Sequence, residues 1–325
     1  MKQKEELISV RNLVVEYKSG GETIHAVNGV SFDLEEGKTL GLVGETGAGK
    51  TSIAKAILRI LPDHATQKVE GDILFQGKEI SKVSEKEMRH YRGKSISMIF
   101  QDPMTALNPV KTVSEQIAEG LRLHQGMSKA EAYKAAVKML ETVGISEDRA
   151  CEYPHQFSGG MKQRVVIAIA LACNPELLIA DEPTTALDVT IQAQVMDLMK
   201  NLQKEMGMAL ILITHDLGVV AEACDTVAVV YAGEIVEFGS KEEIFDHPTH
   251  PYTIGLFGAL PDLSKDVKRL SPVEGLPPDP SNLPKGCSFS PRCPYATESC
   301  KNKTVDMKNL GGTHNVRCNR SEMEV

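Results

Sequence analysis

The stretch GETGAGKT, residues 44–51, decides the fold of this chain of 325 residues, because it fits the phosphate-binding pattern GxxxxGK[ST]. The apolar run 39–43 before it predicts a buried strand, and apolar residues at helical spacing after it predict a helix over 52–61. A strand, a glycine-rich loop and a helix in this order form a P-loop. Its glycines let backbone N–H groups turn toward phosphate oxygens, and the new helix N-terminus adds its positive dipole end.

The residues of this loop have separate expected roles. Lys50 is expected to reach the β- and γ-phosphates of a nucleotide, and Thr51 is expected to bind Mg²⁺. A glycine-rich turn that binds nothing is the alternative, and the flanking strand and helix argue against it. The predicted phosphate-binding residues are Gly44, Glu45, Thr46, Gly47, Ala48, Gly49, Lys50 and Thr51.

A second motif, LLIADEP, spans residues 177–183. The four apolar residues 177–180 fit a central parallel strand, and Asp181 follows at its carboxyl end, where open α/β sheets bind ligands. We expect Asp181 to hold Mg²⁺ directly or through water. We expect Glu182 to polarise the attacking water, as a general base does. The alternative is a strand end with two solvated acids.

A third motif, FSGGMKQR, spans residues 157–164. Ser158, Gly159 and Gly160 are expected to open a helix that continues through 165–172. A serine and two N–H groups at a helix start make a second anion-binding site. An ordinary helix cap is the usual meaning of Ser-Gly-Gly and is the alternative here.

Three shorter motifs complete the series: Gln101 in IFQDP, Asp188 in ALD (186–188) and His215 in ITHD. Along the chain the order is the P-loop, Gln101, FSGGMKQR, LLIADEP, ALD and His215. In that order, the six motifs resemble those of the ATP-binding subunits of ABC transporters. The resemblance implies an α/β fold, a P-loop NTPase cassette with a helical subdomain. It also implies that two cassettes sandwich two ATP molecules, each held by the P-loop of one chain and the signature motif, FSGGMKQR here, of the other.

Individual roles are implied by the same resemblance. The signature serine and glycines grip the γ-phosphate of the other subunit's ATP. The usual signature is LSGGQ, so Phe157 replaces a leucine, and Met161 replaces a glutamine whose hydrogen bond it cannot donate. Four further residues have roles implied by the resemblance, and for two of them, Tyr17 and His215, a purely structural role is the alternative. The implied roles of these four are adenine stacking by Tyr17, contact with Mg²⁺ or the attacking water by Gln101, a bridge to the opposite subunit by Asp188 and a γ-phosphate hydrogen bond by His215.

Composition narrows the class of protein. The hydrophobic share of 42% is ordinary for a soluble protein, and a net charge of −8 argues against a nucleic-acid-binding surface. The longest apolar run, 165–173, falls short of the roughly 18 residues that a membrane-spanning helix needs. The N-terminus lacks the apolar run of a secretory signal. We therefore expect a soluble cytosolic protein whose transport role requires separate membrane subunits.

The length predicts two domains, divided near Gly239. Residues 1–239 form the predicted nucleotide-binding domain, in which strands and helices alternate as a parallel sheet flanked by helices requires. The helical subdomain covers about 112–172, with helices expected over 113–124 and 129–143. Residues 240–325 form a C-terminal extension. It begins with a short helix over 241–246, capped by Ser240, and is extended and proline-rich past Leu260.

Two stretches of this extension, HPTHPYT and GLPPDPSNLPKGCSFSPRCPYA, resemble the tail of ATP-binding subunits of oligopeptide and dipeptide importers, a group with nickel-importing relatives. The resemblance covers the whole chain. It implies an ATPase coupled to peptide transport at the cytoplasmic face of the membrane. The implied partners are a related second cassette in a heterodimer, two membrane permeases and an extracytoplasmic substrate-binding protein.

The chain has seven cysteines. Cys151, Cys173 and Cys224 are expected to be buried small side chains. The spacing of the other four matches no zinc-ribbon pair, and disulfides are the least expected explanation in the cytosol. Four thiolates can hold a [4Fe–4S] cluster or Zn²⁺, and the family resemblance implies the cluster, with zinc and free thiols as alternatives. These four are Cys287, Cys293, Cys300 and Cys318.

The expected role of such a site is structural, because a proline-rich tail with few large apolar residues has little core of its own. The site follows the signature motif by more than a hundred residues and supplies no phosphate ligand. We therefore expect ATP binding to survive its loss.

Two further functions compete with peptide import. One alternative is a soluble ABC ATPase. Those of DNA repair insert coiled coils or zinc modules before the signature motif, and those that act in translation carry two cassettes in one chain. Neither feature occurs in this sequence. Nickel or a small sugar is the alternative cargo. The sequence does not distinguish these cargoes, because the binding protein and permeases select them.

Overall fold

The computed structural model describes residues 6–185, 187–258 and 273–322. Contacts divide the chain into two compact units. Of the described residues, the first unit contains 6–7, 34–39, 82–185 and 187–213, and the second contains 8–33, 40–81, 214–258 and 273–322. The sequence motifs are therefore shared between them. The division predicted near Gly239 is a different one, and it stays a prediction.

Three parallel strands form the sheet of the first unit: β6 (Ile96–Ile99), β7 (Leu177–Asp181) and β8 (Ala209–Ile213). Every residue of β7 and β8 is buried. Continuous apolar runs of this kind fill strands that are covered on both faces. The strand predicted over 177–180 is confirmed, and it extends by one residue to Asp181.

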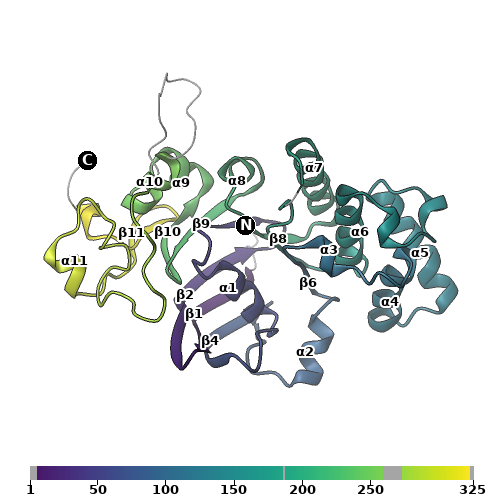
Figure 1. The fold of residues 1–325 in the computed structure, drawn as a ribbon, viewed down its shortest axis with the longest axis horizontal. Helices are drawn as coiled ribbons and strands as arrows, with labels where there is room; N and C mark the ends of the chain where they lie inside the picture. Colours follow the sequence, from purple (N-terminus) through teal and green to yellow (C-terminus); the bar gives the residue numbers. More distant parts are fainter. Residues whose placement is uncertain (1–5, 186, 259–272, 323–325) are drawn as a thin grey trace, which may run out of the picture. The chain divides into compact units, whose positions relative to one another are not determined.

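Helices α4 (Val113–Gln125), α5 (Lys129–Thr142) and α6 (Gly159–Leu171) pack against one another in the first unit (Figure 1). The helices predicted over 113–124 and 129–143 are confirmed to within one residue. Their starts are fixed by capping boxes at Thr112 and Ser128. The other helices of this unit are α2 (Glu85–Tyr91), α3 (Pro103–Ala106) and α7 (Val189–Met206), with 3₁₀ turns at Glu147–Arg149 and Pro154–Gln156.

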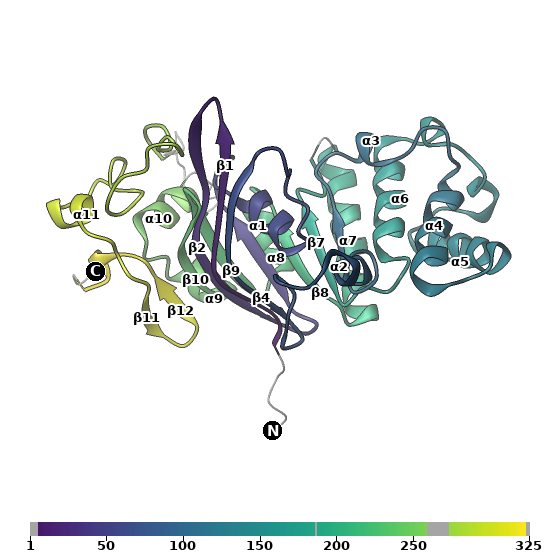
Figure 2. The same cartoon turned by 90° about the horizontal axis from the view of Figure 1, so that it is seen from below.

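An antiparallel sheet lies mainly in the second unit, in the order β2 (Glu22–Glu35), β1 (Glu6–Ser19), β4 (Thr66–Phe75) and β5 (Lys78–Glu79). Figure 2 shows β1, β2 and β4 side by side. Tyr17, the residue implied to stack on adenine, lies on β1. The parallel sheet expected before Gly239 is only part of the arrangement, because β1 pairs with β4 in an antiparallel register.

The strand before the P-loop belongs to another sheet. β3 (Thr39–Val43) pairs in parallel with β9 (Thr226–Tyr231). β9 then pairs antiparallel with β10 (Glu234–Ser240), which crosses the predicted boundary. The sheet continues through β12 (His314–Val316) to β11 (Lys308–Gly311), so residues of the C-terminal extension complete it.

The helices of the second unit are mostly short. They are α1 (Lys50–Ile57), α8 (Leu217–Ala223), α9 (Lys241–Asp246), α10 (Pro251–Gly258) and α11 (Glu298–Asn302), with a 3₁₀ turn at Asn319–Glu322. The helix expected over 52–61 is α1, which ends early. Its C-cap is Leu58, and the next residue, Arg59, has a left-handed φ of 52°. A proline at position 62 also disfavours helix immediately before it.

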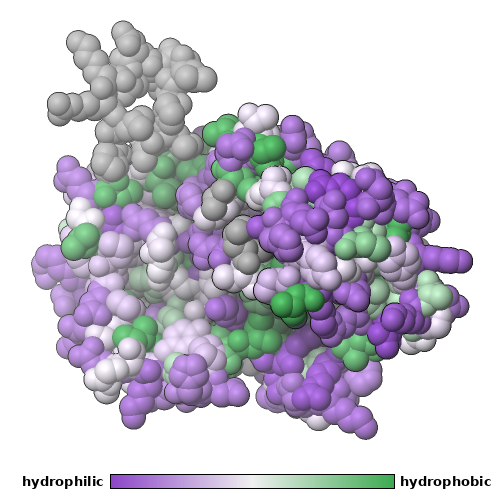
Figure 3. Space-filling view, turned by 45° about the vertical axis from the view of Figure 1, so that its right-hand side comes forward, coloured by the Kyte–Doolittle hydropathy of each residue, from purple (hydrophilic) through white to green (hydrophobic). Residues whose placement is uncertain are grey.

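The surface is largely polar. Figure 3 shows one face on which hydrophilic side chains predominate and hydrophobic side chains gather in small, separate groups. Among the residues that the structure describes, no helix has both the length and the apolar character needed to span a membrane.

Candidate nucleotide-binding site

The P-loop follows the fully buried strand β3 and leads into α1. Two of its glycines are required by the backbone. Gly44 has a φ of 151° and a Cβ there would overlap the carbonyl oxygen of Val230, while Gly49 has a φ of 101° and a Cβ would overlap the carbonyl oxygen of Ala26. Any other residue at either position would force the loop to move.

Lys50 is the first residue of α1, and its side chain is directed into the loop. Its exposed fraction is 6%, and its Nζ donates hydrogen bonds to the carbonyl oxygens of Gly44 at 2.7 Å and Glu45 at 2.9 Å. Thr51 follows on the first turn of the same helix. The loop therefore holds the lysine amine among its own carbonyl groups, at the place where the sequence predicts phosphate.

Tyr17 and His215 are the other predicted site residues of the second unit. The Tyr17 hydroxyl, on β1, donates to Ser52 Oγ on α1 at 3.0 Å, so the structure brings this tyrosine to the P-loop helix. His215 is exposed, between β8 and α8. The side chain of the next residue, Asp216, caps α8 by accepting the N–H groups of Gly218 and Val219.

Glu182 and Gln101 come together in the first unit. Gln101 Nε2 donates to Glu182 Oε2 at 2.9 Å, and Thr185 Oγ1 donates to the same oxygen at 2.9 Å. The Glu182 backbone has a φ of 46°, a region that costs a non-glycine residue roughly 1–3 kcal/mol and that clusters at functional sites. Asp181, only 3% exposed, ends β7 just before it.

The signature motif caps α6. Ser158 is exposed at the helix start, and its Oγ accepts the N–H of Met161 at 3.4 Å. The two departures from the usual signature share one partner. The Arg149 guanidinium lies 4.6 Å from the ring centre of Phe157, and its Nη1 lies 3.1 Å from the Met161 sulfur. Arg149 is thus the group that Phe157 and Met161 both contact.

The ALD motif is described only in part, because Ala186 lies outside the described residues. Asp188 is exposed and caps α7, where its Oδ1 accepts the N–H of Ile191 at 3.0 Å. The same Ile191 limits the space beside Gly160, whose added Cβ would lie 2.6 Å from the Ile191 Cγ2. The signature glycine and the start of α7 are therefore neighbours.

The predicted site residues fall into two groups. Tyr17, the P-loop and His215 belong to the second unit. The first unit contains Gln101, Ser158, Gly159, Gly160, Asp181, Glu182 and Asp188. Within each group, the structure brings Tyr17 to the P-loop helix and Gln101 to Glu182.

Comparison with known proteins places this arrangement in a family. The family model described as "ABC transporter" matches residues 27–185, and that described as "Oligopeptide/dipeptide transporter, C-terminal region" matches residues 236–300. The dipeptide transport ATP-binding protein DppD of Bacillus subtilis is 50% identical over 316 residues, which cover 97% of this chain and 94% of that protein. The chain belongs to the ATP-binding proteins of the oligopeptide/dipeptide ABC transporter family.

Other relatives agree with this membership. The oligopeptide transport ATP-binding protein OppD of Haemophilus influenzae is 52% identical over 297 residues, 91% of each chain. Among solved structures, a dimeric bacterial ABC transporter cassette is 30% identical with a TM-score of 0.64, over 72% of this chain and 98% of that one. The fold is therefore the P-loop cassette of ABC ATPases, with mixed α/β sheets.

Two residues of the family's C-terminal region contact the P-loop, and the sequence interpretation missed both. Arg292 Nη1 and Nη2 donate to the two carboxylate oxygens of Glu45, at 2.8 and 3.0 Å. Tyr252 Oη accepts the backbone N–H of Glu45 at 2.9 Å. No local motif marks either residue, although Tyr252 lies within the HPTHPYT stretch on which the family resemblance rests.

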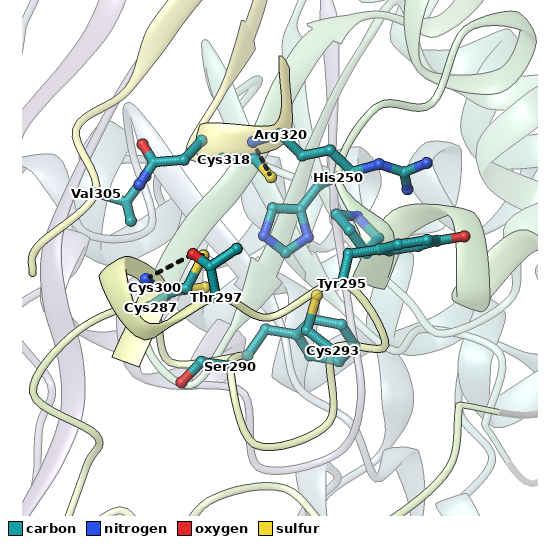
Figure 4. Close-up of a pocket in the computed structure, with 13 residues that line it drawn as sticks. His250, Cys287, Ser290, Cys293, Tyr295, Thr297, Cys300, Val305, Cys318 and Arg320 are labelled. Atoms are coloured by element: carbon teal, nitrogen blue, oxygen red, sulfur yellow. Dashed lines mark hydrogen bonds between the residues drawn. The ribbon is translucent and has the colours of Figure 1, made fainter. Parts of the chain in front are cut away.

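The four cysteines of the C-terminal region line one cavity of about 250 Å³ (Figure 4). The ring of His250 points into the space between them. Burial raises the pKa of Cys287 to about 11 and also raises that of Cys293, and nearby cysteine thiolates contribute in both cases. Within the described part of the chain, no three His, Cys, Asp or Glu side chains converge closely enough to hold a single metal ion.

Hydrogen bonds reach the sulfurs of this cavity in a repeated pattern. The backbone N–H two residues further along the chain donates to Cys287 Sγ from Phe289, to Cys293 Sγ from Tyr295 and to Cys318 Sγ from Arg320. Cys300 Sγ lies 3.2 Å from Thr297 Oγ1. Such hydrogen bonds favour the thiolate, which is the form that binds metals.

The other cysteines only partly match expectation. Cys173 and Cys224 are buried, with exposed fractions of 8% and 4%, as predicted. The prediction for Cys151 was wrong, because this residue is exposed in the turn before the signature motif, with its sulfur 3.4 Å from Tyr133 Oη.

Proposed function

We propose that this chain is the ATP-hydrolysing subunit that powers import of dipeptides and oligopeptides through separate membrane permeases. One observation carries the proposal. About half of the residues are identical to those of dipeptide and oligopeptide transport ATP-binding proteins, and the match covers both the cassette and the C-terminal region. The paired Gln101 and Glu182 side chains and the lysine held in its P-loop supply the parts that ATP hydrolysis needs.

The proposed nucleotide site combines both groups of residues. Residues Gly44 to Thr51 bind the phosphates, Tyr17 stacks on adenine and His215 hydrogen-bonds the γ-phosphate. Thr51, Gln101 and Asp181 hold Mg²⁺, which neutralises charge on the phosphates. The buried carboxylate of Asp181 at a strand end suits a hard cation with oxygen ligands. Glu182 accepts the proton of the attacking water.

The proposed assembly contains two cassettes, and Ser158, Gly159, Gly160 and Asp188 of each chain act on the ATP of the other. A related second chain forms the heterodimer, and two permeases with an extracytoplasmic binding protein complete a transporter at the cytoplasmic face of the membrane. The dimeric state of the similar cassette structure supports the pairing. The cassettes close on ATP and reopen after hydrolysis, and this motion drives the permeases between inward-facing and outward-facing states.

Reconstitution tests the cargo. The chain is assembled in proteoliposomes with the second cassette, the permeases and the binding protein encoded beside it. Uptake of a labelled dipeptide and a labelled pentapeptide is then measured with and without ATP. We expect ATP-dependent uptake of peptide and none with Lys50→Ala. Uptake of Ni²⁺ or a small sugar in place of peptide would overturn the cargo, and a gene neighbourhood without permeases would favour a soluble ABC ATPase.

A second proposal concerns the cysteine cavity: Cys287, Cys293, Cys300 and Cys318 hold a [4Fe–4S] cluster that stabilises the C-terminal region. Two features support it, namely the shared cavity and the N–H groups directed at three sulfurs. A tetrahedral zinc needs all four sulfurs at about 2.3 Å from one centre, whereas each ligand of a cluster binds a different iron.

Iron content tests this second proposal. Protein purified without oxygen is expected to be brown and to contain about four iron atoms per chain. Replacing any one of the four cysteines by serine should bleach it, whereas Cys173→Ser should not. Anaerobic protein that contains stoichiometric zinc and no iron would overturn the cluster.

A further inference from the structure

Three contacts fix Glu45, the second residue of the P-loop. Its carboxylate accepts hydrogen bonds from both terminal nitrogens of Arg292. Its backbone N–H donates a hydrogen bond to Tyr252 Oη, and its carbonyl oxygen accepts one from Lys50 Nζ at 2.9 Å. The first two partners lie 247 and 207 residues away in the sequence, in the region matched as the transporter C-terminal region. The C-terminal region therefore holds the start of the phosphate-binding loop.

Arg292 is itself held from every side. Its side chain is only 5% exposed. Beyond Glu45 it donates to Tyr231 Oη and to the backbone carbonyl oxygens of residues 273 and 274, and it lies over the rings of Tyr231 and Phe289. The hydrogen bond with Glu45 is the main cause that raises the pKa of Arg292. A two-pronged arginine–carboxylate pair of this kind fixes geometry as well as charge.

This pair acts on the nucleotide site in two ways. It sets the orientation of the Glu45 peptide group, whose carbonyl oxygen holds the Lys50 amine. It also neutralises a carboxylate at the loop that is to bind a polyanion, and an unpaired negative charge there would repel phosphate. Arg292 contacts the P-loop at the Glu45 carboxylate, so its proposed effect passes through Glu45.

The same segment carries two of the cavity cysteines. Arg292 directly precedes Cys293, and its N–H donates to the carbonyl oxygen of Phe289 at 3.0 Å. Phe289 lines the cysteine cavity and also lies under the Arg292 guanidinium. Residues 287–293 thus form two successive turns, closed by Ser290 N–H to the Cys287 carbonyl oxygen and by Arg292 N–H to the Phe289 carbonyl oxygen, and this segment contacts both the cavity and Glu45. Arg292 and the Cys293 sulfur are therefore carried by adjacent residues of one segment.

We propose that Arg292 is a positioning residue of the nucleotide site, through which the state of the cysteine cavity sets the affinity of the P-loop for MgATP. The inference builds on the proposed function in taking ATP as the nucleotide. It reverses the expectation that ATP binding is independent of the cysteine site.

The first test replaces the arginine in the full-length chain. Arg292→Gln is expected to raise the dissociation constant for MgATP about tenfold, the lower range for loss of a charged hydrogen bond. In the assembled complex KM for ATP should rise while kcat stays near the wild-type value, because no reacting group changes. Arg292→Lys keeps the positive charge but cannot form the two-pronged pair, so it should give a smaller loss of affinity. Arg11→Gln, which breaks the Arg11–Asp33 pair of the same unit, is the matched control and should bind normally.

A double variant separates positioning from simple loss of structure. In Arg292→Gln with Glu45→Gln, the unpaired carboxylate is gone but the pair that orients the loop is not restored, so affinity for MgATP should recover only in part. Full recovery would assign the whole effect to charge and would overturn the positioning role. A structural defect would not be rescued by a second substitution. Unchanged affinity in Arg292→Gln overturns the proposal, and so does a double variant that binds no better than Arg292→Gln. If Arg292→Gln does not fold, normal affinity in Arg292→Lys overturns it.

The coupling must also run in reverse, because the effect of one site on another is reciprocal. MgATP should change the rate at which iodoacetamide alkylates Cys293, measured by mass spectrometry on the metal-free chain with the exposed Cys151 as internal reference. The change should disappear in Arg292→Gln. A change that persists there assigns the effect to another contact and overturns the coupling. Failure of the cluster proposal would appear separately, as protein without iron, and would leave these measurements unaffected.

Discussion

At the scale of single residues, Glu182 is the group on which hydrolysis is expected to depend. Its strained backbone and the two hydrogen bonds to one carboxylate oxygen fix its side chain. Glu182→Gln keeps the shape but loses the base. ATP hydrolysis by the assembled complex should fall by roughly 10²–10⁴. Phosphate release measures the loss, and a nucleotide-binding assay should show that affinity for MgATP is retained.

Lys50→Ala is the contrasting control for this prediction. It removes the buried amine that lies among the loop carbonyl groups, so affinity for ATP itself should be lost. Near-normal turnover in the Glu182→Gln complex would remove Glu182 from the mechanism.

Thiol reactivity gives a second prediction at this scale. Burial raises the pKa of Cys224 to about 12, while Cys151 is exposed. Only the thiolate reacts with iodoacetamide, so at pH 8 Cys224 should be alkylated at least about tenfold more slowly than Cys151 in the folded chain. Mass spectrometry of both peptides measures the two rates. Denaturation should equalise them, and equal rates before denaturation would contradict the burial.

The residues that the sequence predicts are those whose chemistry needs a fixed local spacing. The P-loop and the Asp181–Glu182 pair can be recognised because each is a short motif at the end of a strand. Arg292 and Tyr252 cannot be recognised in this way. Their partner, Glu45, lies 247 and 207 residues away, and an arginine or tyrosine that pairs across the fold leaves no local pattern.

At the scale of elements, helix starts are the features that the sequence predicts best. The start of α9 is predicted because its cap, Ser240, and the capping glutamate, Glu243, are neighbours in the sequence. The antiparallel pairing of β1 with β4 is missed, because it joins segments that only the tertiary fold aligns. The β11–β12 hairpin is missed as well, although two glycines with positive φ, Gly311 and Gly312, give a turn signal.

Glu243 provides the prediction for this scale, because it joins α9 to the β11–β12 hairpin. Its carboxylate accepts the N–H of Ser240 at 2.8 Å and both the N–H and the hydroxyl of Thr313. Burial acts to raise the pKa of Glu243, but the hydrogen bonds from Thr313 and Ser240 outweigh it and lower the pKa below 4.5. The ionised carboxylate therefore stabilises the folded chain at neutral pH.

Glu243→Gln should lower the free energy of unfolding by about 1 kcal/mol at pH 7, since charged hydrogen bonds become neutral ones. A lowered folded-state pKa means that the wild-type advantage is complete above pH 4.5 and is lost as the pH falls through the folded-state pKa. Chemical denaturation at pH 7 and at the acid limit of folding measures the difference. Glu242→Gln, at the exposed neighbouring position, is the matched control, and an equal loss there would contradict the assignment.

At the scale of the whole molecule, the C-terminal region is part of the fold that supports the nucleotide site. β12 extends the sheet that contains β3, and Arg292 and Tyr252 hold the loop that follows β3. Composition alone could not show this role of the C-terminal region. A proline-rich tail with few large apolar residues predicts a segment that lies outside the main fold. What the sequence does predict at this scale, the family and its cassette fold, rests on motif order rather than on any single motif.

The last prediction concerns the composite site. If Ser158 acts on the ATP of the other cassette, one chain holds only half of each site, so the isolated chain should bind MgATP but hydrolyse it slowly. Ser158 is exposed at the start of α6, where a bulky cation can be introduced without entering a core. Ser158→Arg should leave MgATP binding at this chain's own P-loop intact and abolish the stimulation of hydrolysis by the partner cassette.

Ser84→Arg, the same change at the exposed cap of α2, controls for loss of a helix cap and should leave stimulation unchanged. Photolabelling each chain with an azido-ATP, together with phosphate release, separates binding from turnover. Full activity from a strict monomer would contradict the composite site, because a second chain would then have nothing to add to the chemistry.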